Sequence, residues 1–114
     1  MYIIANAFSI QMIPNGGMVH FTPVSSDYVR ESCEVYDYES IVGHEDTARV
    51  FSEQLGLDIP CNRKTYTVPA GESQCIFVGQ LIGGRLPEGA TKLPEGFEIK
   101  WYAVDILAYF DLKD

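Results

Sequence analysis

The sequence predicts an α/β or α+β fold in a single domain spanning residues 1–114, with a mixed sheet of about five strands, one main helix and shorter helices. Two observations predict this fold. Short apolar segments rich in strand-forming residues recur along the chain, separated by turns that contain glycine and proline. Between them, residues 45–55 repeat their apolar positions at helical spacing. A chain of 114 residues is long enough to bury one core and too short for two.

The first predicted elements lie in the N-terminal third of the chain. Residues 2–8 form a short apolar run, which predicts a strand. A Pro-Asn-Gly-Gly turn at 14–17 precedes a second predicted strand at 18–24, whose proline places it at an edge of the sheet. Residues 25–27 offer a helix cap, and residues 28–33 are predicted to form one or two helical turns.

The main helix is predicted at residues 45–55. Its apolar positions include Ala48, Phe51 and Leu55, whose spacing places them on one face of a helix. Two acids at its start suit the positive end of the helix dipole. Gly56 follows as a C-terminal cap.

The C-terminal half predicts three more strands. They are expected at residues 65–68, 74–82 and 97–104. The second of these is apolar enough for a central position in the sheet, and the third alternates and closes it. Residues 83–90 are predicted to form the loop between them.

Composition and charge exclude several classes of protein. The net charge of −8 repels polyanions, so binding of long DNA or RNA along an open face is disfavoured. No apolar run approaches the roughly 18 residues that a membrane helix needs, and the N-terminus lacks the basic segment of a signal peptide. We therefore expect a cytoplasmic protein without a membrane partner, in the host cell if the source is viral.

Three cysteines, Cys33, Cys61 and Cys75, give an odd number with no C-x-x-C spacing. This pattern argues against a disulfide framework and against a zinc cluster. We expect free thiols that are buried or half-buried. With a single candidate histidine and no paired histidines, a catalytic metal is not expected.

His44 is the first candidate for chemistry. It follows Gly43 at the predicted start of the main helix, where free backbone N–H groups and the helix dipole favour an anion. A histidine there can give a proton to a bound phosphate ester, and it can equally do no more than cap the turn. The other histidine, His20, lies in the edge-strand pattern and is expected to be exposed or half-packed.

Further candidates combine glycine, arginine and small polar residues. Gly84 and its neighbouring glycine let the backbone approach a ligand, and Arg85 supplies a planar fork for phosphate oxygens. Arg63 belongs to a pair of adjacent cations, which is also the composition of a solvated turn. Asn6 and Ser9 can hydrogen-bond bases or phosphates, or cap a turn.

Four motifs in order resemble those of a known family. They are NAFSI at 6–10, a glycine–histidine pair at 43–44 followed by an acid and a helix, NR at 62–63, and a strand leading to an arginine and LPEG at 85–89. This order resembles that of the small viral and phage-borne ring nucleases, the anti-CRISPR enzymes that act against type III systems. The resemblance spans nearly the whole chain, with a similar final strand.

The resemblance implies a homodimer that binds cyclic tetra-adenylate and cleaves it to linear di-adenylates without a metal or cofactor. It implies that the neighbouring 2′-hydroxyl attacks the phosphate. His44 is then the catalytic acid, Arg85 positions the scissile phosphate, and Glu88 is a second catalytic-site residue. No general base is evident in the sequence.

The resemblance also implies a set of ligand-binding residues, which are Asn6, Ser9, Gln11, Arg63 and Gly84. Gln11 stands where some members have asparagine. The segment 80–85 is one residue longer than in some members.

Two other functions remain open. The same fold can act as a non-catalytic module that sequesters a cyclic nucleotide, which needs the arginines but no titrating histidine. The chain can also be an acidic interaction protein with a basic partner and no nucleotide ligand.

Overall fold

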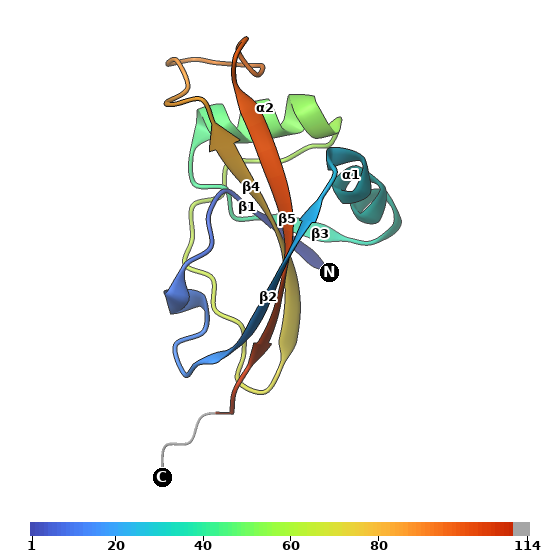
Figure 1. Ribbon diagram of the computed structural model, residues 1–114, viewed down its shortest axis with the longest axis vertical. Helices are drawn as coiled ribbons and strands as arrows, with labels where there is room; N and C mark the ends of the chain where they lie inside the picture. The colour runs from blue at the N-terminus through green and yellow to red at the C-terminus, as the bar shows by residue number, and fades with distance from the viewer. Residues whose placement is uncertain (111–114) are drawn as a thin grey trace.

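The sheet determines the architecture of the protein, which is described for residues 1–110 of a computed structural model (Figure 1). Five strands form one mixed sheet in the order β2-β5-β4-β1-β3. β1 pairs in parallel with β3 and β4, whereas β5 pairs antiparallel with β2 and β4. The predicted mixed sheet is confirmed, with β2 at an edge and β4 in the interior. The strands are β1 (Tyr2–Ala5), β2 (Gly17–Val24), β3 (Tyr38–Ser40), β4 (Ser73–Ile82) and β5 (Glu98–Ala108).

Two α-helices and one short 3-10 helix, η1, complete the fold. They are α1 (Ser26–Val35), α2 (Glu45–Leu55) and η1 (Ile10–Met12). The Ser25 hydroxyl accepts a hydrogen bond from the backbone N–H of Tyr28 and so caps α1. Gly56 ends α2 with a left-handed backbone at φ 67°, as predicted. α1 has 10 residues and α2 has 11, so the second helix is longer than the one or two turns predicted for residues 28–33.

The structure corrects the predicted strands at three places. Residues 65–68 form no strand, because this segment crosses one face of the sheet and the N–H of Val68 donates to the carbonyl of Met12 outside the strand ladders. Val68 is buried there, which explains its apolar character. The short strand β3 was not predicted, and its three residues are fixed by parallel pairing with β1. β1 itself ends at Ala5 rather than at residue 8.

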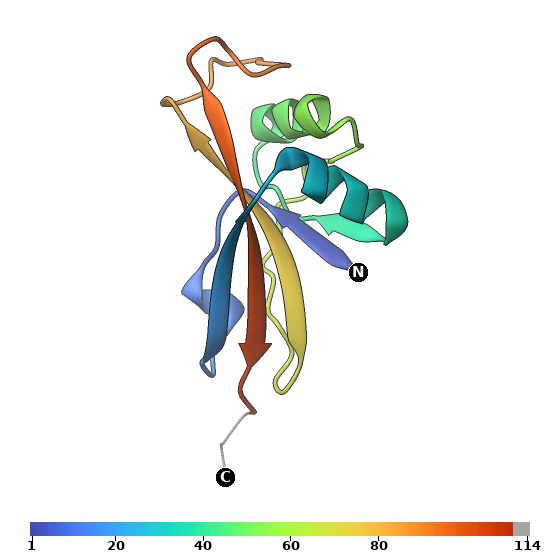
Figure 2. The same ribbon diagram turned by 45° about the vertical axis from the view of Figure 1, so that its right-hand side comes forward.

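Each face of the sheet has its own core. On one face, α1 and α2 cover Phe77 and Trp101, and the ring of Phe51 lies 4.8 Å from that of Trp101. On the opposite face, the loop with η1 and the segment before β4 cover a cluster that includes Ile76 and Val104. Figures 1 and 2 show the two helices together on one side and η1 on the other.

The helices cover only one end of their face. The molecule measures 52 × 28 × 21 Å, and β2, β4 and β5 extend together beyond the helices as a three-stranded ribbon (Figure 2). At the other end, the long connection between β4 and β5 lies beside α2 (Figure 1). We call this connection, residues 83–97, the site loop.

Candidate functional site

His44 is the residue immediately before α2, and its ring is free of the helix. Its backbone is extended, and its carbonyl accepts the first helical hydrogen bond, from the N–H of Ala48 at 2.9 Å. The His44 side chain caps no backbone N–H group and is exposed. His44 therefore occupies the N-cap position through its backbone alone, and its imidazole is available to a ligand.

The His44 ring lines a cleft of about 520 Å³ between the start of α2 and the site loop. The cleft brings together the three predicted catalytic residues, His44, Arg85 and Glu88. Its other lining residues are Asp46, Thr47, Leu81 and Leu86, which the sequence did not single out. We refer to it below as the cleft.

The backbone of Gly84 explains the position of Arg85. Gly84 has φ 114°, a value that residues with a Cβ rarely adopt, and no atom lies within 4 Å of where its Cβ would be. Glycine is therefore needed for the turn of the chain rather than for space. Gly84 does not itself line the cleft, so its predicted contact with a ligand stays a prediction.

A second group of predicted residues meets at Gly43. The Asn6 Oδ1 atom accepts a hydrogen bond from the Gly43 N–H at 3.5 Å. A Cβ on Gly43 would lie 3.4 Å from Cγ of Arg63, so the stem of this arginine passes over the glycine. Asn6 and Arg63 therefore both contact the residue that precedes His44.

A buried hydrogen-bond network fixes the segment that carries Arg63. The Ser40 hydroxyl, 3% exposed, donates to the carbonyl of Pro60 at 2.6 Å and accepts from the N–H of Val42 at 3.2 Å. The Asn62 side chain donates to the Ser40 carbonyl at 2.9 Å, and its N–H donates to the Val42 carbonyl at 2.8 Å. The NR motif is thus attached to the chain that leads into His44.

Ser9 and Gln11 are placed differently from the other predicted ligands. The Ser9 hydroxyl accepts from the N–H of Gln11 at 3.3 Å and caps η1, and neither residue lines the cleft. The capping alternative therefore describes Ser9 in this structure. Their role in binding stays a prediction.

Two arginines near His44 have no acidic partner within the described residues. Among residues 1–110, Arg63 and Arg85 form no ion pair within 4 Å, whereas Arg49 is paired with Asp46. Two unpaired guanidinium groups are therefore available for phosphate oxygens. Glu88 is the acid in the cleft for which no ion pair occurs in this part of the chain.

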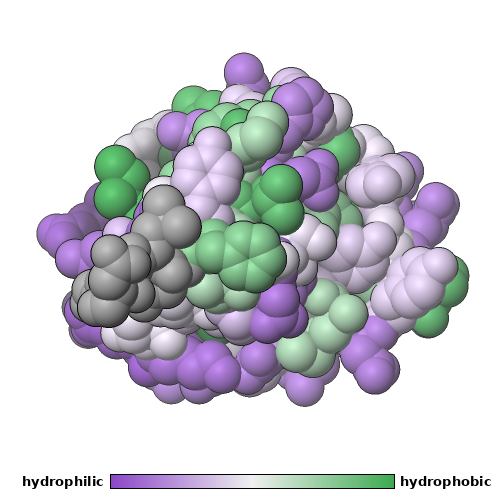
Figure 3. Space-filling model, turned by 90° about the horizontal axis from the view of Figure 1, so that it is seen from below, coloured by the Kyte–Doolittle hydropathy of each residue, from purple (hydrophilic) through white to green (hydrophobic). Residues whose placement is uncertain are grey.

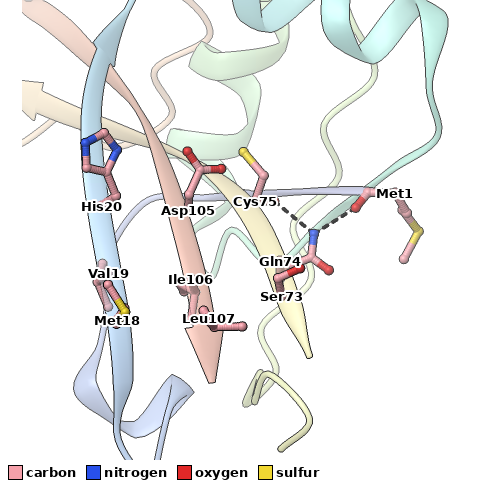
Figure 4. Close-up of a pocket in the computed structure, with 10 residues that line it drawn as sticks. All are labelled: Met1, Met18, Val19, His20, Ser73, Gln74, Cys75, Asp105, Ile106 and Leu107. Atoms are coloured by element: carbon pink, nitrogen blue, oxygen red, sulfur yellow. Dashed lines mark hydrogen bonds between the residues drawn. The ribbon is translucent and has the colours of Figure 1, made fainter. Parts of the chain in front are cut away.

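A separate hollow of about 610 Å³ lies on β2, β4 and β5 (Figure 4), and it shares no lining residue with the cleft. His20, Asp105 and Cys75 stand there in one row, because both His20 and Cys75 are paired in register with Asp105. Burial and the Asp105 carboxylate raise the pKa of the Cys75 thiol to about 12. His20 is exposed, as expected, and the hollow contains none of the predicted site residues.

The end of the ribbon mixes polar and apolar side chains on its surface (Figure 3). Met18 and Leu107 are exposed there. The three thiols are free, with Cys33 buried and Cys75 half-buried as expected. Cys61 is exposed, so the prediction was wrong for this residue.

Metal sites and membrane-spanning helices are both absent from the described residues. No cluster of three or more His, Cys, Asp or Glu side chains within residues 1–110 is arranged to hold a metal ion. No helix in the same residues is long and apolar enough to cross a membrane.

Comparison with known proteins identifies the family. The model of the STIV B116-like family matches residues 2–103. The chain belongs to this family. Among solved structures it is similar to B116 of Sulfolobus turreted icosahedral virus, at 22% identity and a TM-score of 0.67, over 90% of this chain and 97% of that one. No curated protein matches the chain.

The B116-like family takes its name from a viral protein, in agreement with the viral part of the sequence resemblance. At 22% identity, the structural similarity to B116 establishes a shared fold. Ring-nuclease activity is not part of either description.

Proposed function

We propose that this member of the B116-like family is a viral, metal-independent ring nuclease that cleaves cyclic tetra-adenylate and so switches off type III CRISPR signalling. The observation that carries the proposal is the cleft, in which His44, Arg85 and Glu88 meet although Arg85 and Glu88 are distant from His44 in sequence. These are the three residues that the sequence resemblance assigns to catalysis.

The chemistry requires a bent RNA backbone, stabilised charge and one proton. The 2′-hydroxyl gives its proton to water and its oxygen attacks the adjacent phosphorus. The bond from phosphorus to the 5′-oxygen breaks, and a 2′,3′-cyclic phosphate remains. Arg85 and the free N–H groups of α2 bind the phosphate, and the His44 imidazolium gives its proton to the leaving 5′-oxygen. Two such cuts release two linear di-adenylates.

We further propose a homodimer, because a four-fold symmetric ring presents equivalent phosphates to two copies of the site. The second copy lies over an apolar hollow of about 330 Å³ that includes Phe8, Phe21 and Gln80. Phe8 belongs to the NAFSI motif, and Gln80 is near the end of β4 that leads into the site loop. Gln80 is adjacent on β4 to Leu81, which lines the cleft, so a partner on this face lies near the end of the sheet that carries the cleft.

The deciding experiment incubates the purified protein with labelled cyclic tetra-adenylate in EDTA and separates the products. Linear di-adenylates support the enzyme. Tight binding without cleavage identifies a sequestering module instead, and absence of both leaves the acidic interaction protein as the better description.

His44→Ala tests the proton donor. Cleavage in a single turnover is expected to slow by roughly 10²–10⁴-fold with little change in affinity, since the proton is needed only as charge develops on the leaving oxygen. An unchanged single-turnover rate in folded His44→Ala overturns the catalytic role.

Arg85→Ala tests the phosphate contact. Binding and cleavage are expected to weaken together by about 1.5–3 kcal/mol, the usual value of a hydrogen bond to a charged group. Arg85→Lys restores only part of this, because an ammonium lacks the planar fork. Wild-type activity in both variants would make Arg85 an ordinary loop residue.

Phe21→Glu tests the dimer, with Met18→Glu as the matched control. Both residues lie exposed on β2, and they face opposite sides of the sheet. Phe21→Glu is expected to give a monomer by light scattering and to lose cleavage, whereas Met18→Glu remains an active dimer. The reverse pattern places the interface on the helix side of the sheet.

A further inference from the structure

The site loop is held against α2 by two side chains of that helix. The Asp46 Oδ2 atom accepts a hydrogen bond from the Gly89 N–H at 3.3 Å. Nε of Arg49 donates to the carbonyl of Ala90, also at 3.3 Å. Asp46 and Arg49 form an ion pair with each other, so the two contacts belong to one unit.

Few side-chain hydrogen bonds join the site loop to other segments. Within residues 1–110, the bonds of Asp46 to Gly89 and of Arg49 to Ala90 are the two side-chain hydrogen bonds between the site loop and the rest of the chain. The remaining backbone bonds of the loop, such as that from Ala90 to Pro87, lie within it. Gly89 adopts φ 80° with no atom within 4 Å of its Cβ position, so neighbouring atoms do not confine it there.

The attached residues are adjacent to the proposed catalytic residues. Glu88 immediately precedes Gly89, and Arg85 lies in the same loop and lines the same cleft. His44, by contrast, stands on the helix side of the cleft, two residues before Asp46. The contact of Asp46 with Gly89 therefore joins the two halves of the site.

We propose that Asp46 and Arg49 are positioning residues, which hold the site loop on α2 so that Arg85 and Glu88 face His44. This inference rests on the function proposed above and extends it to two residues that act through the site loop. In this proposal Asp46 and Arg49 maintain the shape of the cleft and take no part in the cleavage step itself.

The same pair adjusts the charge of the cleft. Asp46 lines the cleft, and a free carboxylate there would repel a phosphate. Arg49 and the N–H of Gly89 neutralise and occupy its two oxygens. Of the charged groups that line the cleft, Arg85 and Glu88 then remain free of ion pairs within the described residues.

α1 offers a matched control for a lost ion pair. Asp27 and Arg30 form a pair with the same spacing in the first turn of α1, at 2.9 Å, and this pair contacts no site-loop residue. Asp27→Ala and Asp46→Ala thus remove equivalent helical pairs, and only the second removes a contact to the site loop.

Hydrogen–deuterium exchange measures the attachment without any substrate. Backbone exchange in residues 86–92 is expected to be about three- to tenfold faster in Asp46→Ala than in wild type, and unchanged in Asp27→Ala. Arg49→Lys keeps the charge and loses the planar donor. Its exchange rate in residues 86–92 is expected to lie between those of Asp46→Ala and Asp27→Ala. Exchange that stays at the wild-type rate in Asp46→Ala overturns the inference.

Cleavage kinetics then test whether the attachment matters for the reaction. Single-turnover cleavage is expected to be about tenfold slower in Asp46→Ala and unchanged in Asp27→Ala. In the Arg85→Ala background, removal of Asp46 is expected to cost much less, because both changes act through the same loop. Equal losses in the two backgrounds overturn the positioning role, since a general loss of stability would act independently of Arg85.

The two proposals fail in different ways. Faster exchange in Asp46→Ala, together with no cleavage by wild type, removes the ring-nuclease proposal and leaves the attachment of the loop established. Normal cleavage by Asp46→Ala with faster exchange removes the positioning role alone.

Discussion

Ser40→Ala is expected to destabilise the protein and to weaken ligand binding at a distance. The Ser40 hydroxyl makes two hydrogen bonds, to the Pro60 carbonyl and from the Val42 N–H. A typical intramolecular hydrogen bond contributes about 0.5–1.5 kcal/mol net, so the loss of both lowers the free energy of unfolding by about 1–3 kcal/mol. Val42 is fully buried, and no water can replace the lost partner without opening the core.

Chemical denaturation followed by Trp101 fluorescence measures this change, with Ser73→Ala as the control. Ser73 is exposed at the start of β4, and its replacement is expected to change the free energy of unfolding by less than about 0.5 kcal/mol. The slope against denaturant should stay the same in both variants. If Ser40→Ala had the same free energy of unfolding as Ser73→Ala, the reasoning would be refuted.

The effect of Ser40→Ala on function follows from the same network. Ser40 attaches the Pro60–Asn62 segment, and Arg63 comes next in the chain. A looser segment is expected to weaken binding of the proposed ring ligand while leaving the single-turnover rate of bound ligand close to wild type. A slower rate with unchanged affinity would contradict this explanation.

Two further predictions concern the sheet. Gly79→Ala is expected to lower stability by about 1–3 kcal/mol, since its Cβ would lie 2.7 Å from Cζ of Phe51 and 2.8 Å from Cη2 of Trp101; an unchanged melting temperature would show that these rings can move apart. Cys75 is expected to react slowly with thiol reagents at pH 8 because its pKa is raised to about 12, and its rate should rise about tenfold per pH unit below that value. Asp105→Asn lowers the pKa of Cys75 and accelerates the reaction, and a rate independent of residue 105 would exclude the carboxylate as a cause.

Elements specified by local sequence were the ones that sequence analysis could predict. The apolar spacing of α2 and its terminal Gly56 lie within one segment, and both were correct. β3 was not predicted because its residues Tyr38–Ser40 become a strand only through pairing with β1. The prediction of a strand at residues 65–68 failed for a different reason. This segment has the composition of a strand, but it covers one face of the sheet instead of pairing within it.

The candidate site likewise combines features that local sequence reveals with contacts between residues remote in sequence. His44 could be located from the glycine before it and the helix after it, and Arg85 and Glu88 came from ordered motifs. Asp46 was interpreted only as a favourable charge at a helix start. Its contact with Gly89 joins residues that are remote in sequence, and neither segment alone contains a pattern that reveals it.

The position of β1 between β3 and β4 has a consequence for synthesis. Ile3 pairs with Ile76, and Ile4 with Phe77, so the N-terminal strand emerges from the ribosome long before its inner partner exists. Until then a strand that is almost fully buried in the finished protein stays exposed. Such remote pairing predicts folding on a scale of milliseconds to seconds and a nascent chain prone to aggregation. We therefore expect the yield of folded protein to depend on how well β1 is shielded until β4 has been made.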